Sequence, residues 1–317
     1  MVIIILQFTH GAAAGSLYGL LGIAVALMVR GNVAPNPALG AVATLSALTA
    51  YWFADRLDLP FPALVLLGML AGGALAAIVE LATVVPLGRP GVLRQTPFAP
   101  MLAAIAAWIG LDALAGVATG PAGVSFPAGS MPATVFGSDD NILSLIDLFC
   151  LFVGFAGAGL IHWMLVGSRF GNALSAIRYD ALAAALGGVN PRRMLLLASA
   201  LAGVLAGAVG VCAAAASSLA GGSVGVELGQ GLIWKAIATV VLSGGLATRN
   251  VAASRVLSGH IMAIGLLLGI VENGCALTLP QHMPLTPWQG DAAAALLLLI
   301  VLRPSGLFAS RTPMPPR

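Results

Sequence analysis

The sequence predicts an all-α protein, a polytopic transmembrane helix bundle of about eight or nine spans. Of its 317 residues, 59% are hydrophobic and only 8% are charged, whereas about a quarter of the residues in a soluble domain are charged. The mean hydropathy is +1.02. The apolar residues also form blocks of about 20, the length that a helix needs to cross about 30 Å of hydrocarbon.

Nine apolar blocks are candidate spans of a single domain over residues 1–317. The first is too long for a signal peptide and lacks a basic leader and a small-residue cleavage site, so we expect a retained helix. The second and the last are short enough to enter the membrane and return on the same side. In chain order the blocks are about 4–29, 38–54, 61–86, 97–119, 141–166, 195–215, 232–248, 256–279 and 289–303.

The basic residues predict the orientation of the bundle. If the N-terminus is external, Arg56 lies in an external loop and Lys235 within a span, while the rest of the 14 basic residues lie on the internal side. Basic residues collect on the internal side of membrane proteins. The sequence therefore predicts an external N-terminus and an internal C-terminus, and its net charge of +3 gives no reason to expect nucleic acid as a partner.

Small residues predict close helix packing. Glycines four apart let two helix backbones approach, either in ordinary bundle packing or in contacts that rearrange. Such pairs are Gly11 and Gly15, Gly68 and Gly72, Gly203 and Gly207, and Gly265 and Gly269. The three cysteines, Cys150, Cys212 and Cys275, lie in apolar blocks without metal-type spacing, so we interpret them as packing residues.

Several ionisable residues fall within the spans, where a charge is costly and usually has a partner or a wet cavity. They are His10, Glu80, Asp112, Asp147, His162, Lys235, His260 and Glu272. Asp147 and His162 lie near span ends, where an interhelical hydrogen bond or a position at the membrane interface explains them more simply than a functional role. For Glu80 and Glu272, a structural and a functional role explain the sequence equally well. The stretches LAAIVELA and LLGIVENGCA around them are alike, as in an inverted repeat.

Enzymatic signatures are missing from the sequence. It has no G-x-x-x-x-G-K-[ST] phosphate loop, no H-E-x-x-H and no Cys/His cluster with metal-ligand spacing, and Lys235 is its only lysine. We therefore expect neither an enzyme nor a cofactor or metal bound by this chain. An active site hidden within the membrane is the remaining alternative.

The stretch SRFGNALSAIRYDALAAALGGVNPRRM, residues 168–194, predicts a short internal helix. Asp180 is a good N-cap, ALAAAL has high helix propensity, Gly187 or Gly188 can end the helix, and Pro191 blocks its continuation. Leu182 and Leu186 share one face. This face either lies on the membrane surface or docks into a protein.

Arginines flank this helix on both sides in the sequence. Arg169, Arg178, Arg192 and Arg193 suit anionic lipid headgroups as well as an acidic rim on a soluble protein. The residues alone leave the two partners open.

The same stretch resembles the cytoplasmic loop of branched-chain amino acid ABC importer permeases, with the approximate pattern G-R-A-x-R-A-x-A-x-[DN]-x-x-x-A-x-x-x-G-I-[ND]-x-x-R. The matching residues are Gly171, Ala173, Ala176, Asp180, Ala184, Gly188, Asn190 and Arg193. GSLYGLLGIAVAL, KAIATVVLSGGL, LLLGIVE and RPSGLF are similar to other segments of that family in the same order, and Glu80 keeps its spacing to Pro86 and Leu87.

The sequence departs from the family pattern at three places. Val84 and Val85 fill the place of the family's Y-R before Pro86. The segment NPALG, Asn36 to Gly40, stands where the family has N-F-A-H-G. Asn172 and Ser175 stand where the loop pattern has arginines.

The resemblance implies a permease subunit in a bacterial inner membrane, with the N-terminus periplasmic and the C-terminus cytoplasmic. The implied partners are a second permease subunit, membrane lipid, a periplasmic substrate-binding protein and two ATPase subunits, which bind the ATP. It implies coupling to the ATPase through Arg178, Asp180, Leu182, Ala184, Leu186, Gly188 and Arg193. For the translocation pathway we expect Asn36, Glu80 and Glu272.

Other functions fit the same residues. One is a related permease for urea, amides or sugars. A second is a stand-alone secondary transporter in which Glu80 and Glu272 carry the coupling ion. A third is a membrane scaffold that transports nothing.

Overall fold

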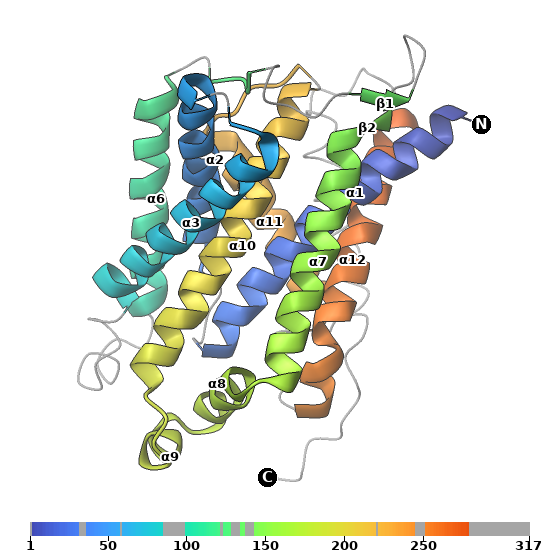
Figure 1. The fold of residues 1–317 in the computed structure, drawn as a ribbon. Coiled ribbons are helices and arrows are strands. Elements are labelled where there is room, and N and C mark those ends of the chain that lie inside the picture. Colours follow the sequence, from blue (N-terminus) through green and yellow to red (C-terminus); the bar gives the residue numbers. More distant parts are fainter. Residues whose placement is uncertain are drawn as a thin grey trace.

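The computed structural model describes residues 2–31, 36–57, 59–84, 99–120, 123–127, 134–136, 143–219, 221–244 and 251–278. Its longer helices are α1 (Val2–Gly31), α2 (Ala38–Leu57), α3 (Phe61–Val79), α6 (Ala99–Thr119), α7 (Leu145–Gly167), α10 (Pro191–Leu219), α11 (Val226–Leu242) and α12 (Val251–Thr278). The shorter elements are the π-helical turn η1 (Glu80–Val84), α8 (Arg169–Tyr179), α9 (Ala181–Leu186), and the strands β1 (Thr134–Phe136) and β2 (Leu143–Ser144). The prediction of a helical bundle is confirmed, with one antiparallel two-stranded ribbon added to it (Figure 1).

The helices follow the apolar blocks of the sequence. Seven blocks correspond to α1, α2, α3 with η1, α6, α7, α10 and α12. The block 232–248 only overlaps α11, which begins at Val226 and ends at Leu242, and the ninth, 289–303, lies outside the described residues. Six of the described helices are long and apolar enough to cross a membrane, namely α1, α3 with η1, α6, α7, α10 and α12.

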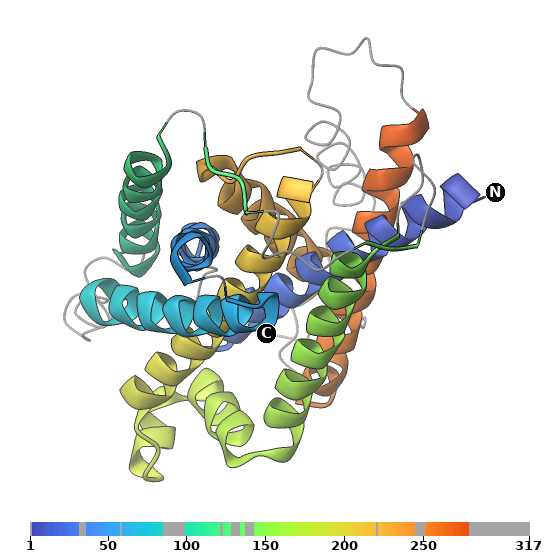
Figure 2. The same ribbon diagram turned by 45° about the horizontal axis from the view of Figure 1, so that its top comes forward.

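The centre of the bundle is formed by α1, α2 and α10. Every residue from Ala38 to Leu48 is buried, so the first half of α2 is enclosed on all its faces. In Figure 2, α2 is seen almost end-on among α3, α6 and α10, each of which contacts it. In contrast, α6 and α7 are mostly exposed, with large apolar side chains facing outward, as expected for helices against lipid.

The glycine pairs of the sequence meet one another across two helix crossings. A β-carbon on Gly11 would lie 2.9 Å from the carbonyl oxygen of Gly269, and one on Gly15 would lie 2.5 Å from that of Gly265. These contacts join α1 to α12. The crossing of α3 with α10 is built in the same way, by Gly68, Gly72, Gly203 and Gly207. The predicted close packing is confirmed, because neither crossing has room for a side chain.

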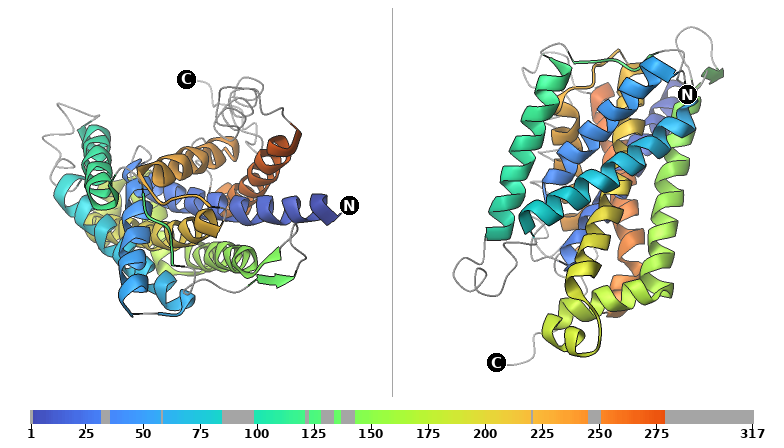
Figure 3. Two further views of the ribbon diagram at one scale, coloured as in Figure 1. Left: turned by 90° about the horizontal axis from the view of Figure 1, so that it is seen from above. Right: turned by 60° about the vertical axis from the view of Figure 1, so that its left-hand side comes forward.

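The two ends of the bundle differ. The N-terminus and the β1–β2 ribbon lie at the upper end in Figure 1, and α8 and α9 lie at the lower end. The right-hand view of Figure 3 shows α8 and α9 below the ends of α7 and α10, which they connect.

Residue Pro191 has a second role besides the predicted one. Helix α9 ends before it, as expected, but the next span, predicted to begin near residue 195, begins at Pro191 itself. The Asn190 side chain accepts a hydrogen bond from the Arg193 N–H at 3.3 Å. An N-cap followed by proline at the first helical position is a favoured start, because that N–H has no partner within the helix in any case. No flexible linker therefore separates the loop helices from α10.

Candidate functional site

A polar cavity of about 730 Å³ lies between α1, α7, α10, α11 and α12. Its lining includes residues from the connection between α10 and α11 and from the first turn of α7. These segments belong to the end of the bundle opposite to α8 and α9 (Figure 1). The polar side chains that line it are His10, Tyr18, Asp147, Ser217, Ser223, Glu227, Lys235, Glu272 and Asn273.

Two charged groups of the cavity, Lys235 of α11 and Glu272 of α12, contact each other. The Lys235 ammonium forms an ion pair with Oε1 of Glu272 and donates a hydrogen bond to the Tyr18 hydroxyl at 3.0 Å. The same ammonium lies 4.6 Å from the centre of the Tyr18 ring, within the range of a cation–π contact. Two charges taken out of water are tolerated because they face each other.

A second pair of ionisable groups lies nearer the end of the bundle. Nδ1 of His10 in α1 is 2.9 Å from Oδ2 of Asp147 in α7. Asp147 lies in the first turn of α7, where an acidic group is favoured by the helix dipole. The Ser144 hydroxyl caps the same helix end by accepting a hydrogen bond from the Ile146 N–H at 3.3 Å.

The cavity reaches from the end of the bundle to its middle. Glu227 lies in the first turn of α11 and is exposed, and Lys235 follows eight residues later, a rise of about 12 Å along the helix. Beyond Lys235, a β-carbon on Gly22 of α1 would overlap the Thr239 hydroxyl of α11, and Thr239 is fully buried. The helices therefore close the cavity below Lys235.

At the other end of the bundle, α9 has the predicted boundaries. Oδ1 of Asp180 accepts hydrogen bonds from the N–H groups of Leu182 at 2.8 Å and Ala183 at 3.0 Å. At the C-terminus, the Val189 N–H donates to the Ala184 carbonyl at 3.0 Å, and the next bond inward runs from Gly188 to Ala185 at 3.1 Å. With Gly188 at φ +88°, this is a Schellman motif.

The outer face of α9 is apolar and exposed. Leu182 and Leu186 are 73% and 84% exposed, whereas Ala184 is buried against the rest of the chain. Asp180, Gly188 and Arg193 are exposed, and the side chain of Arg178 lies outside the described residues. The residues expected to contact an ATPase thus lie together at one end, and that role stays a prediction.

Helix α8 was missed by our reading of the sequence. Ser168 caps it, accepting a hydrogen bond from the Gly171 N–H at 3.4 Å, and Leu174 and Ile177 are buried. A β-carbon on Gly171 would overlap the Leu165 carbonyl at the end of α7. The Ser168 cap and the apolar positions three apart could have revealed it. Helix α8 links α7 firmly to α9.

The three residues expected in the pathway are not brought together. Glu272 lines the cavity, but Asn36 and Glu80 do not. The Asn36 side chain accepts a hydrogen bond from the Ala38 N–H at 2.9 Å and so caps α2. Glu80 is buried at the start of η1. Sequence analysis had placed His10, Asp147 and Lys235 within spans, yet it could not pair them.

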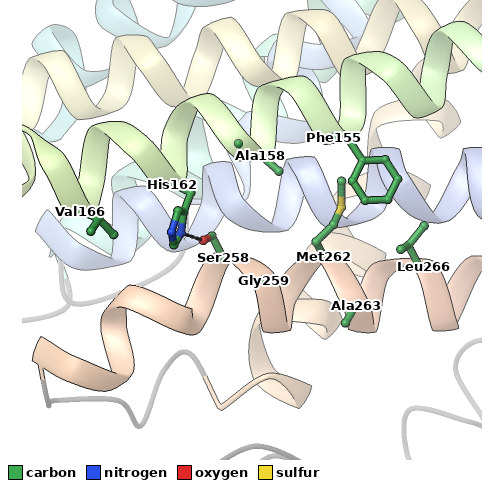
Figure 4. Close-up of a pocket in the computed structure, with 10 residues that line it drawn as sticks. Phe155, Ala158, His162, Val166, Ser258, Gly259, Met262, Ala263 and Leu266 are labelled. Carbon is green, nitrogen blue, oxygen red and sulfur yellow. Dashed lines mark hydrogen bonds between the residues drawn. The ribbon is translucent and has the colours of Figure 1, made fainter.

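A second hollow lies between α7 and α12 and is almost entirely apolar (Figure 4). Its volume is about 740 Å³. The polar contact drawn there joins Nδ1 of His162 to the Ser258 hydroxyl at 2.7 Å. The predicted interhelical hydrogen bond of His162 is confirmed. With small residues such as Gly159 and Gly259 along its walls, this groove suits apolar contacts rather than a polar solute.

Comparisons with known proteins agree with this architecture. The family described as "Branched-chain amino acid transport system / permease component" matches residues 7–302. No match was found among curated proteins. A solved structure, "PsaBC from Streptococcus pneumoniae in complex with Fab", is similar with a TM-score of 0.51 and 16% identity, over 93% of this chain and 91% of that one. At this identity, the likeness concerns the fold alone.

The family match covers nearly the whole chain, and the six described apolar helices match the multi-pass architecture of a membrane permease. Membership in a family of this kind implies ATPase and binding-protein partners. The chain belongs to the branched-chain amino acid transport permease family of ATP-binding-cassette transporters.

Proposed function

We propose that this chain is the transmembrane permease subunit of an importer for branched-chain or other amino acids. It receives the solute from a periplasmic binding protein and releases it into the cytoplasm of a bacterium by alternating access. The cavity opens toward the periplasm, and α9 faces the cytoplasm, in line with the orientation favoured by the basic residues. The chain itself carries out no enzymatic reaction, and partner ATPases bind the ATP.

The observation that carries this proposal is the arrangement of two sites at opposite ends of one rigid unit. The cavity is lined from α7 and α10, and the same two helices continue without a flexible linker into α8 and α9. A displacement of α9 by an ATPase is therefore transmitted along α7 and α10 to the cavity walls. A second permease subunit completes the transmembrane pore.

The face formed by Leu182 and Leu186 is the proposed contact with the ATPase. Two exposed leucines on a capped helix of fixed position suit insertion into an apolar groove of a protein. Arg193, at the start of α10, suits an acidic rim around that groove. In this assignment Asp180 and Gly188 shape the helix, while the leucines make the contact.

Co-purification and uptake test the proposal together. Leu186→Glu places a charge on the contact face, and we expect it to abolish both ATPase association and ATP-dependent amino acid uptake in vesicles. Ala181→Glu is the matched control, because Ala181 is exposed and lies about 100° around the helix from Leu182 and about 140° from Leu186.

Two outcomes would overturn the proposal. One is unchanged association and uptake in Leu186→Glu. The other is uptake that persists without ATP and is lost in Glu272→Gln, which would favour the ion-coupled secondary transporter.

A further inference from the structure

The cavity between α1, α7, α10, α11 and α12 carries an excess of acidic groups. Asp147, Glu227 and Glu272 line it, against the single lysine Lys235. The described residues that line it carry a net charge of −2 when His10 is neutral and −1 when His10 is protonated. A cavity with low-dielectric walls concentrates the field of such groups, which raises the local concentration of cations and lowers that of anions.

Glu272 has a hydrogen-bond acceptor to spare. One carboxylate oxygen, Oε1, takes the Lys235 ammonium. The other, Oε2, is buried and accepts no hydrogen bond from the described residues. Glu272 is only 8% exposed, and leaving a buried carboxylate oxygen without a donor is costly. An ammonium group that entered the cavity would supply the missing donor.

The geometry fits an ammonium-bearing solute that enters from the end of the bundle. Such a solute meets Glu227 in the exposed first turn of α11 and the lining carboxylates of Asp147, beside His10, and of Glu272. The volume of about 730 Å³ lies within the range of about 300–1,000 Å³ that small-molecule sites occupy. Lys235 and Tyr18 hold the Glu272 side chain in place through Oε1 and the ammonium.

We infer that this cavity is a transit site selective for solutes that carry an ammonium group, which the Glu272 carboxylate binds, and that it excludes solutes of net negative charge. The inference rests on the importer function proposed above. It adds a second selection step within the permease: a deaminated acid of similar size would be rejected here even when a binding protein delivers it.

The charge of the cavity can be measured without transport. Ser217 lines the cavity, so Ser217→Cys, in a chain whose three native cysteines are replaced by alanine, provides a reporter thiol. The assembled importer is treated with two methanethiosulfonates of similar size, one carrying a trimethylammonium group and one a sulfonate. Each rate is divided by the rate of the same reagent with a free thiol.

We expect the cationic reagent to react with Ser217→Cys at least about tenfold faster than the anionic one. Glu272→Gln, which keeps the shape of the side chain, should lower this ratio at least about threefold. Glu227→Gln should lower it by a smaller amount, and its exposed position keeps it informative if Glu272→Gln fails to assemble. Ser125→Cys, an exposed reporter on the loop after α6 at the edge of the cavity, should show a smaller ratio than Ser217→Cys.

The inference would be overturned if the cationic and anionic reagents reacted with Ser217→Cys at equal corrected rates. It would also be overturned if neither Glu272→Gln nor Glu227→Gln lowered the ratio of the two rates. Neither result depends on ATP or on uptake. The proposed function fails separately, if the wild-type importer shows no ATP-dependent uptake.

Discussion

Lys235 of α11 and Glu272 of α12, 37 residues apart in the chain, form an ion pair in the interior of the bundle. Their side chains are only 12% and 9% exposed, so water screens this interaction little. The pair fixes the contact between two helices and also closes the inner end of the polar cavity.

The ion pair predicts an asymmetric effect of mutation. Glu272→Leu leaves the Lys235 ammonium without its carboxylate, and we expect it to destabilise the protein by about 3–5 kcal/mol. The double variant Lys235→Met with Glu272→Leu removes both charges and should recover most of that loss. Unfolding of the purified protein in detergent measures the effect. Equal destabilisation in the single and double variants would contradict this account.

The crossing of α3 and α10 predicts that even a methyl group is rejected there. Gly72→Ala would push a β-carbon into the Gly203 carbonyl, and we expect it to destabilise the protein by about 1–3 kcal/mol through overpacking. Gly259→Ala in α12 is the control, since a β-carbon there meets open space and alanine favours a helix. The melting temperature and monodispersity of both variants test this; a control that melts earlier than Gly72→Ala would refute it.

Two adjacent glycines after α9 should respond differently to the same change. Gly188 has φ +88°, whereas Gly187 has φ −77°. A left-handed conformation costs a residue with a side chain about 1–2 kcal/mol. Gly188→Ala should therefore speed hydrogen exchange at the Val189 amide, which bonds to Ala184, by about tenfold. Gly187→Ala should leave it unchanged, and a similar rate in both variants would show that the Schellman motif is not the restraint.

The loop after α6 is held at the edge of the cavity by a side-chain contact. The Phe126 N–H donates to the Ser218 hydroxyl at 3.1 Å, and Val124 and Val224 exchange two backbone hydrogen bonds at 3.1 and 2.7 Å. Ser218→Ala removes the bond to Phe126, worth about 1 kcal/mol, together with the bond from the Ser218 hydroxyl to the Ala214 carbonyl within α10.

We expect hydrogen exchange at Phe126 to become about fivefold faster in Ser218→Ala. Ser217→Ala is the control, because the Ser217 hydroxyl bonds only within its own helix, to Ala214. If Ser217→Ala has the same effect on Phe126, the contact with Ser218 does not hold the loop.

Local features of the sequence were sufficient for much of the fold. Hydrophobic blocks gave most of the helices, because a chain in hydrocarbon must satisfy its backbone within each span. The ends of α9 were equally readable, since Asp180 and Gly188 act on hydrogen bonds only a few residues away. The start of α10 at Pro191 also has a local cause, the cap at Asn190 followed by proline, although we predicted the start of this span near residue 195.

The candidate site was decided by tertiary structure. The sequence identified Lys235, Glu272, His10 and Asp147 as costly charges that need partners, but partners on four different helices are chosen by how those helices cross. The same holds for the glycines: their spacing predicted close contacts, and only the fold paired α1 with α12 and α3 with α10. Composition thus predicted a membrane environment, and local sequence predicted most helices and the caps of α9. Long-range packing determined which charged residues share a cavity.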